Sequence, residues 1–123
     1  MRPLVSVVDD DESVRESLPD LLNELGFAVQ AFASAEEFLG SAYVDQTDCL
    51  LLDIAMPGMS GFDLQRALVA SQRKIPIVFI TAFGDTNLRG RMLQLGAAGC
   101  LLKPFSDTAL REAVDSALRA AEP

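Results

Sequence analysis

Four short apolar runs constrain the fold of this chain more than any other feature of its sequence. Each is bounded by polar or turn residues and is apolar at consecutive positions, which indicates a strand buried on both faces, as in a parallel sheet. The runs are LVSVV (4–8), CLLLD (49–53), IPIVFI (75–80) and CLL (100–102). A fifth run, FAVQAF (27–32), contains the polar residue Gln30 and is expected to be an edge strand.

Helical patterns separate these runs. Apolar residues recur at helical spacing from Val14 to Leu25, and Gly26 is expected to end that helix. Ser34 with Glu37 predicts a capping box at the start of a short second helix. Three further helices are predicted at residues 62–72, at residues 86–95 and after the cap residue Ser106.

This alternation of strand and helix predicts an α/β fold with a doubly wound five-stranded parallel sheet. The common strand order for five strands is 2-1-3-4-5, the flavodoxin-like arrangement, and it places the weak second strand at an edge. Residues 1–123 are expected to form one domain, because the chain has a single domain's length and no internal linker.

Composition narrows the class of protein. The formal net charge is −8 and there is no histidine, so nonspecific contact with nucleic acid or an anionic membrane is disfavoured. Cys49 and Cys100 lie in apolar runs and are expected to be reduced core thiols. No apolar run approaches the roughly 20 residues of a membrane helix. We therefore expect a cytoplasmic protein that does not contact a membrane.

Polar residues follow the buried strands at their carboxyl ends. They are Asp9, Asp10, Asp53, Thr81 and Lys103. The carboxyl ends of parallel strands lie along one edge of the sheet, where ligands bind at the switch point between the first and third strands. The sequence therefore predicts one cleft that holds three carboxylates, a hydroxyl and an ammonium group.

In such a cleft one carboxylate must stay protonated unless a cation joins the group. Two carboxylates about 5 Å apart repel by roughly 3 kcal/mol at an effective dielectric constant near 20. Oxygen ligands without histidine favour Mg²⁺ over Zn²⁺. Asp53, the central carboxylate, could then accept a phosphoryl group as a nucleophile, with Lys103 and Thr81 facing the other phosphoryl oxygens.

The chain also resembles the receiver domains of two-component response regulators, whose sheet is the CheY-like form of this fold. The motifs that carry the resemblance are VVDDDESVR, LLLDIAMPGMSG, ITAFGD and LLKPF, in the family's order over almost the whole chain. The segments SAEEFL and KPFSD make it most similar to the FixJ-type branch. The Gly58 and Gly61 positions of MPGMSG are expected to supply positive φ angles in a tight turn.

The resemblance implies a role for each residue of the cleft. Asp53 is similar to the aspartate that accepts a phosphoryl group from a sensor histidine kinase. Asp10 and Asp53 resemble direct Mg²⁺ ligands, Asp9 a ligand acting through water, and the backbone carbonyl of Ala55 a further ligand. Lys103 resembles the lysine that pairs with the phosphoryl group, and Thr81 the hydroxyl that moves to bind it. Asp11 and Glu12 match no ligand position and are expected in the first turn of the first helix.

The resemblance also implies partners and an output. The expected partners are a sensor histidine kinase and, after phosphorylation, a second copy bound through the face formed by residues 86–95, the fifth strand and the last helix. Transcription would be regulated through DNA only by an output domain beyond residue 123. The alternative is a single-domain phosphorelay receiver.

Two other classes of protein fit less well. A Mg²⁺-dependent aspartyl-phosphate phosphatase needs a second acid two residues after its nucleophile, where this chain has Ala55. A flavin carrier needs a phosphate-binding loop after the first strand, where this chain has four acids. We therefore expect no enzyme beyond self-phosphorylation and self-dephosphorylation. Cys100 stands where the family usually has an aromatic switch residue, and a thiol cannot act as that ring. Phe83 could substitute for the ring, but we expect activation to order or shift the helix at residues 86–95 instead of flipping one ring.

Overall fold

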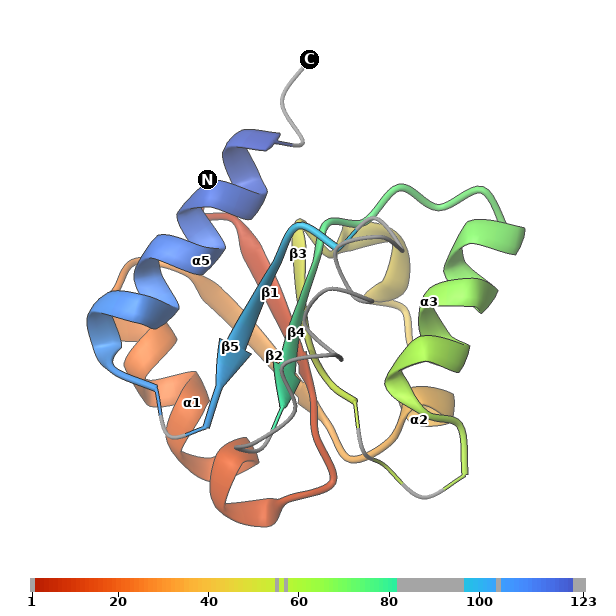
Figure 1. Cartoon of the computed structure of the whole chain (residues 1–123), viewed down its shortest axis with the longest axis horizontal. Coiled ribbons are helices and arrows are strands. Elements are labelled where there is room, and N and C mark those ends of the chain that lie inside the picture. The colour runs from red at the N-terminus through yellow and green to blue at the C-terminus, as the bar shows by residue number, and fades with distance from the viewer. Residues whose placement is uncertain (1, 55, 57, 82–96, 104, 121–123) are drawn as a thin grey trace.

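The computed structural model describes residues 2–54, 56, 58–81, 97–103 and 105–120 (Figure 1). Its five strands are all parallel and form one sheet in the order β2-β1-β3-β4-β5. They are β1 (Leu4–Val8), β2 (Ala28–Phe32), β3 (Cys49–Asp53), β4 (Ile77–Thr81) and β5 (Gly99–Leu102). The predicted fold class and strand order are therefore confirmed, and β2 is an edge strand.

The described α-helices lie between the strands or follow the last strand, as predicted, and a short 3₁₀ helix that was not predicted precedes β3. They are α1 (Glu12–Glu24), α2 (Ala35–Leu39), the 3₁₀ helix η1 (Val44–Gln46), α3 (Gly61–Ala70) and α5 (Asp107–Ala120). The predicted helix at residues 86–95 and Phe83 lie outside the described residues. No helix within the described part of the chain is both long and apolar enough to cross a membrane.

Two strands begin later than predicted: β2 by one residue, at Ala28, and β4 by two residues, at Ile77. Residues 75–80 were expected, but β4 starts at Ile77 and ends at Thr81. Pro76 has no N–H to donate to a ladder, and its carbonyl accepts the Leu50 N–H at 2.9 Å just ahead of the strand. The shift places Thr81 in the sheet, as the last residue of β4.

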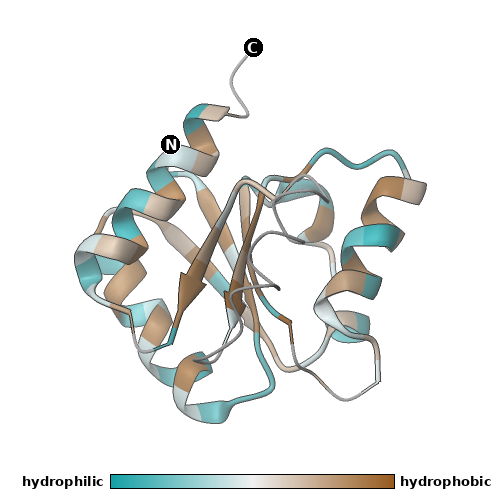
Figure 2. Cartoon of the chain, in the orientation of Figure 1, coloured by the Kyte–Doolittle hydropathy of each residue, from teal (hydrophilic) through white to brown (hydrophobic). Residues whose placement is uncertain are grey.

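The helices cover both faces of the sheet, with α1 and α5 on one face and α2 and α3 on the other (Figure 1). The strands carry hydrophobic residues, and the helices alternate between hydrophobic and polar surfaces (Figure 2). Alternate residues of each buried strand therefore enter different cores. In β3, for example, Leu51 packs toward α1 and α5, while Leu50 and Leu52 pack toward α3.

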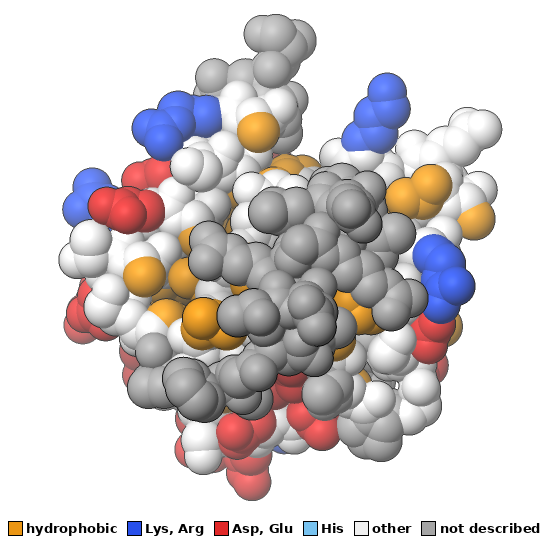
Figure 3. Space-filling model, viewed as in Figure 1, with side chains coloured by type: hydrophobic (Ala, Val, Ile, Leu, Met, Phe, Trp, Pro, Cys, Tyr) orange, Lys and Arg blue, Asp and Glu red, His pale blue; other side chains and the backbone are white. Residues whose placement is uncertain are grey.

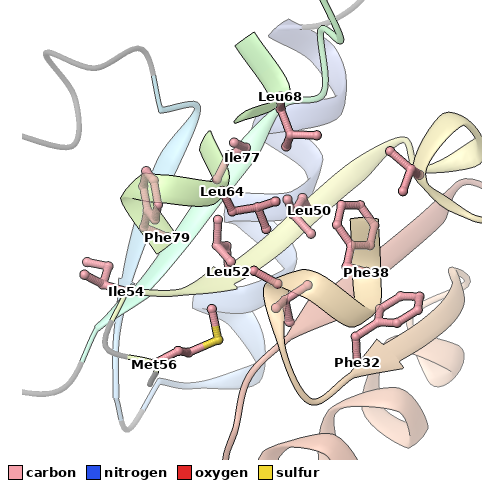
Figure 4. Close-up of a cluster of buried hydrophobic side chains, with 13 residues drawn as sticks. Phe32, Phe38, Leu50, Leu52, Ile54, Met56, Leu64, Leu68, Ile77 and Phe79 are labelled. Atoms are coloured by element: carbon pink, nitrogen blue, oxygen red, sulfur yellow. The ribbon is translucent and has the colours of Figure 1, made fainter. Parts of the chain in front are cut away.

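The core beneath α2 and α3 supports the third strand up to its carboxyl end (Figure 4). Phe32 and Phe38 pack edge to face with their ring centroids 5.3 Å apart, a favourable arrangement for aromatic pairs. Ile54 and Met56, which follow β3, are also buried in this cluster. This packing buries the end of β3 in the same core as Ile54 and Met56.

Side-chain caps begin the helices close to where the sequence predicts them. The Ser34 hydroxyl accepts the Glu37 N–H at 3.1 Å, but the Glu37 carboxylate accepts the N–H of Ala33 instead of Ser34, so the predicted capping box is only half formed. A complete capping box joins Ser60 and Asp63 at the start of α3. The hydrogen bond from the Ser60 backbone is the main reason why the pKa of Asp63 lies below its ordinary value.

Neither Cys49 nor Cys100 forms a disulfide, as predicted. Burial in the core, together with the negative charge of Asp48, raises the pKa of Cys49 to about 12. In the unfolded chain this thiol ionises from its ordinary value of 9.0. The stability that the neutral buried thiol contributes is therefore complete below pH 9 and is lost as the pH rises toward 12.

We expect the free energy of unfolding to fall by about 1.4 kcal/mol between pH 8 and pH 10 because of Cys49 alone. Urea unfolding at the two pH values should show this fall in the wild type and in Cys100→Ala. The fall should be smaller by that amount in Cys49→Ala. An equal fall in all three proteins would contradict the assignment.

Candidate metal and phosphoryl site

Three carboxylates meet at the carboxyl edge of the sheet. Asp9 and Asp10 follow β1, and Asp53 is the last residue of the neighbouring β3. One carboxylate oxygen from each lies within 4.8 Å of the others. Figure 3 shows acidic side chains gathered at the lower edge of the molecule, where β1 ends and α1 begins in Figure 1. The structure thus brings together the acids that the sequence singled out.

The burial of the three acids differs. Asp9 is completely buried and Asp53 is 7% exposed, whereas Asp10 is exposed. Charges this close and this far from water repel one another strongly unless a cation lies between or beside them. The cluster is therefore favourable only with a positive partner.

Lys103 supplies one positive partner. Its ammonium group, just past β5, donates to Asp9 Oδ2 at 2.9 Å although 94 residues separate the two in sequence. Burial by itself lowers the pKa of Lys103, but the hydrogen bond to Asp9 and the charges of Asp9, Asp53 and Asp11 outweigh it and leave the pKa above its ordinary value. Lys103 is therefore charged at neutral pH.

Thr81 is the last residue of β4. This strand pairs with β3, which ends at Asp53, on the side opposite β1. The β3–β4 register pairs Asp53 with Ile80, so Thr81 follows directly. Thr81 is 7% exposed, and its carbonyl accepts the Lys103 N–H at 2.9 Å, which ties the two strand ends together. Thr81 and Lys103 therefore lie at neighbouring positions of the same edge.

Every polar atom of Asp9 has a partner. Its N–H donates to the Phe32 carbonyl at 3.1 Å, and its Oδ1 accepts the Asp11 N–H at 2.9 Å. Its carbonyl accepts Nη1 of Arg15 at 3.0 Å, in addition to the Lys103 contact at Oδ2. Asp11 is the N-cap of α1, with its side chain accepting the Ser13 N–H, so it lies one position before the first turn in which it was predicted.

The donor set suits a hard divalent cation. The group that the structure assembles contains only carboxylate oxygens, the ligands that Mg²⁺ prefers, and three acids leave coordination positions for water and phosphate. Asp10 is exposed, and no hydrogen bond from the described residues holds its carboxylate. The residues therefore fit Mg²⁺. Ala55, whose carbonyl was predicted as a further ligand, lies outside the described residues.

Gly61 brings the start of α3 against the backbone of Asp53. A Cβ atom at position 61 would lie 2.7 Å from the Asp53 carbonyl oxygen and 3.0 Å from the Ile54 Cα. The Gly61 N–H donates to the Ile54 carbonyl at 3.1 Å. The predicted positive φ is found at Gly58 but not at Gly61, where close approach is the reason for glycine.

Sequence reasoning missed two contributors to the site. Arg15 lies in the motif VVDDDESVR, but no spacing rule connects an arginine in a helix with a carbonyl six residues earlier. The close approach at Gly61 likewise depends on how α3 returns to β3.

Cys100 is half-buried on β5 and packs in the core beneath α3 beside Phe79, its register partner on β4.

The sequence of this chain matches a known protein family and several of its members. A family model described as the response regulator receiver domain matches residues 5–115. Nodulation protein W of Bradyrhizobium diazoefficiens is 45% identical over 116 residues, which cover 94% of this chain and 51% of that protein. Transcriptional regulatory protein FixJ of the same organism is 39% identical over 119 residues, covering 97% and 58%. The chain spans about half the length of these curated relatives.

A comparison of structures gives the same result. The crystal structure of FixJ-N has a TM-score of 0.88 and 37% sequence identity to this chain. The match covers 100% of this chain and 98% of FixJ-N. The whole architecture described above is therefore shared with a solved structure.

Proposed function

Because this chain belongs to the response regulator receiver domain family, we propose that it is a phosphorylation-dependent switch of a two-component system. Receiver domains of response regulators interact with sensor kinases. The observation that carries the proposal is the group of three carboxylates within 4.8 Å, with Lys103 paired to one of them, at the carboxyl edge of the sheet. Residues 1–123 would act together as the phosphoacceptor domain.

Asp53 is the proposed phosphoacceptor. One of its carboxylate oxygens attacks the phosphorus of the kinase's phosphohistidine; a P–O bond forms as the P–N bond breaks, and the bonding electrons leave with the imidazole. The packing of β3 holds Asp53 in place during this transfer. Lys103 exchanges its contact with Asp9 for one with a phosphoryl oxygen, and the Thr81 hydroxyl binds another.

Receiver domains generally use Mg²⁺ at an acidic pocket. In this chain Asp10 and Asp53 would hold the ion directly, Asp9 through water, and the Ala55 carbonyl would complete the protein ligands. The ion supplies the positive charge that lets an anionic donor approach three carboxylates. Asp9, fixed by four contacts, orients the neighbouring ligands.

The output proposed for the switch is the control of transcription, supported by the name of the relative FixJ, a transcriptional regulatory protein. The face formed by β5, α5 and the predicted helix at residues 86–95 would change on phosphorylation and pair with a second copy. Leu102 of β5, 43% exposed, is an apolar side chain available on this face. DNA would be contacted only through an output domain.

The proposal is tested by phosphorylation without a kinase. The protein is incubated with a small-molecule phosphodonor, once with Mg²⁺ and once with a chelator, and its intact mass is measured. We expect a mass increase of one phosphoryl group with Mg²⁺ and none with the chelator. No adduct under either condition, or equal adducts under both, would contradict the proposed chemistry.

A further inference from the structure

Arg15 makes an unusual contact for an arginine in an acidic segment. Its guanidinium donates from Nη1 to the backbone carbonyl of Asp9 at 3.0 Å, in a partly buried position. Within the described part of the chain it forms no ion pair, although Asp9, Asp10, Asp11 and Glu12 all precede it closely. The contact is therefore with the main chain of the loop and not with its charges.

The carbonyl that Arg15 holds belongs to the Asp9–Asp10 peptide. The Asp9 side chain is fixed independently, by Lys103 and by the Asp11 N–H. The carboxylate of Asp10 is exposed and no hydrogen bond from the described residues holds it. Within the described residues no hydrogen bond restrains the Asp10 side chain itself, and Arg15 is the side chain that restrains the peptide plane leading into it.

We propose that Arg15 is a positioning residue of the metal site: by clamping the Asp9–Asp10 peptide it aims the Asp10 carboxylate at the cation. This inference rests on the proposed function, because it assumes that Asp10 is a metal ligand. Arg15 itself touches neither the cation nor the phosphoryl group. Replacing a group that orients a metal ligand without touching the metal typically weakens metal affinity 10–100-fold.

Positioning and simple charge predict opposite results when Arg15 is replaced. As a charge, the guanidinium repels a divalent cation, so its removal should tighten metal binding. As a clamp, it lowers the conformational freedom of Asp10, so its removal should weaken metal binding. The sign of the change in affinity therefore separates the two roles.

The experiment measures Mn²⁺ binding by the loss of the free-ion electron paramagnetic resonance signal. The proteins are the wild type, Arg15→Met, Arg15→Lys and the control Arg111→Met. Arg111 is exposed on α5, and its Nε lies 3.8 Å from Asp115 Oδ2, so its variant loses the same charge away from the loop. We expect the Kd of Arg15→Met to rise about tenfold, that of Arg15→Lys to rise about threefold, and that of the control to stay within about twofold.

Each other outcome has a definite meaning. A Kd that is unchanged or lower in Arg15→Met overturns the positioning role, including when its melting temperature falls. Should Arg15→Met fail to fold, Arg15→Lys decides, and an unchanged Kd in that variant overturns the proposal. If the wild type itself binds no Mn²⁺, the proposed function fails, and the positioning role fails with it.

Discussion

Asp53→Asn is expected to abolish the phosphoryl adduct formed with a small-molecule donor and Mg²⁺. An amide oxygen is a far weaker nucleophile than a carboxylate, and Asp53 is one of the three acids of the cluster and the proposed acceptor. Intact mass after a fixed incubation should show a loss of at least about a hundredfold, since Asp53 is the proposed acceptor and Asp9 and Asp10 are assigned to the metal. A phosphoryl adduct equal to that of the wild type would contradict the assignment of Asp53.

The same substitution should stabilise the protein without metal. It removes two of the three repulsive carboxylate pairs, each worth up to roughly 3 kcal/mol before screening and the contribution of Lys103. We expect a net gain of about 1 kcal/mol in the free energy of unfolding, measured by urea unfolding in the presence of a chelator.

Asp48→Asn is the matched control. Asp48 immediately precedes the other end of β3 and accepts the Leu4 N–H at 2.7 Å, which an amide oxygen can also do. Asp48→Asn should form as much phosphoryl adduct as the wild type, and its free energy of unfolding should not rise.

Gly61→Ala is expected to damage the site through the backbone of Asp53. The new Cβ would meet the Asp53 carbonyl oxygen at 2.7 Å, so the start of α3 or the end of β3 must move. Forced overpacking typically costs about 1–3 kcal/mol of stability, and a displacement of about 1 Å can slow a positioned reaction by up to a hundredfold. We expect both a lower urea midpoint and phosphoryl acceptance slower by about tenfold or more.

Gly40→Ala is the matched control for this substitution. Gly40 is the C-cap of α2 in a right-handed helical conformation, and its Cβ would meet only the Glu36 carbonyl at 3.5 Å and the Glu37 carbonyl at 4.0 Å. These are ordinary contacts, so stability and phosphorylation should stay near those of the wild type. If Gly61→Ala behaved like Gly40→Ala, the close approach at Asp53 would not matter for the site.

The fold was predictable because its signals are local. Apolar runs such as LVSVV and CLLLD indicate strands buried on both faces, and the cap at Ser34 and the turn at Gly26 mark helix ends within a few residues. The strand boundaries shifted by one or two residues at Pro76, where hydrogen bonding between strands decides the outcome. The edge position of β2 followed from one polar residue, Gln30.

The acidic cluster was predictable for a topological reason. Once the strands are parallel, their carboxyl ends must lie along one edge, and Asp9, Asp10 and Asp53 follow or end two neighbouring strands. The charge repulsion among them then indicates a cation before any coordinates are known. Which acid is buried could not be inferred, because exposure depends on how α1 leaves β1.

The sequence by itself determined the order of strands, the sheet edge that carries the acids, and the chemistry that such an edge can support. Only the tertiary structure decided that Lys103 pairs with Asp9, that Arg15 holds the Asp9 carbonyl and that Gly61 lies against Asp53. Periodicity and caps depend on neighbours a few residues apart, and the sequence displays them directly. These three contacts join side chains and backbone through the packing of whole elements, so no local pattern encodes them.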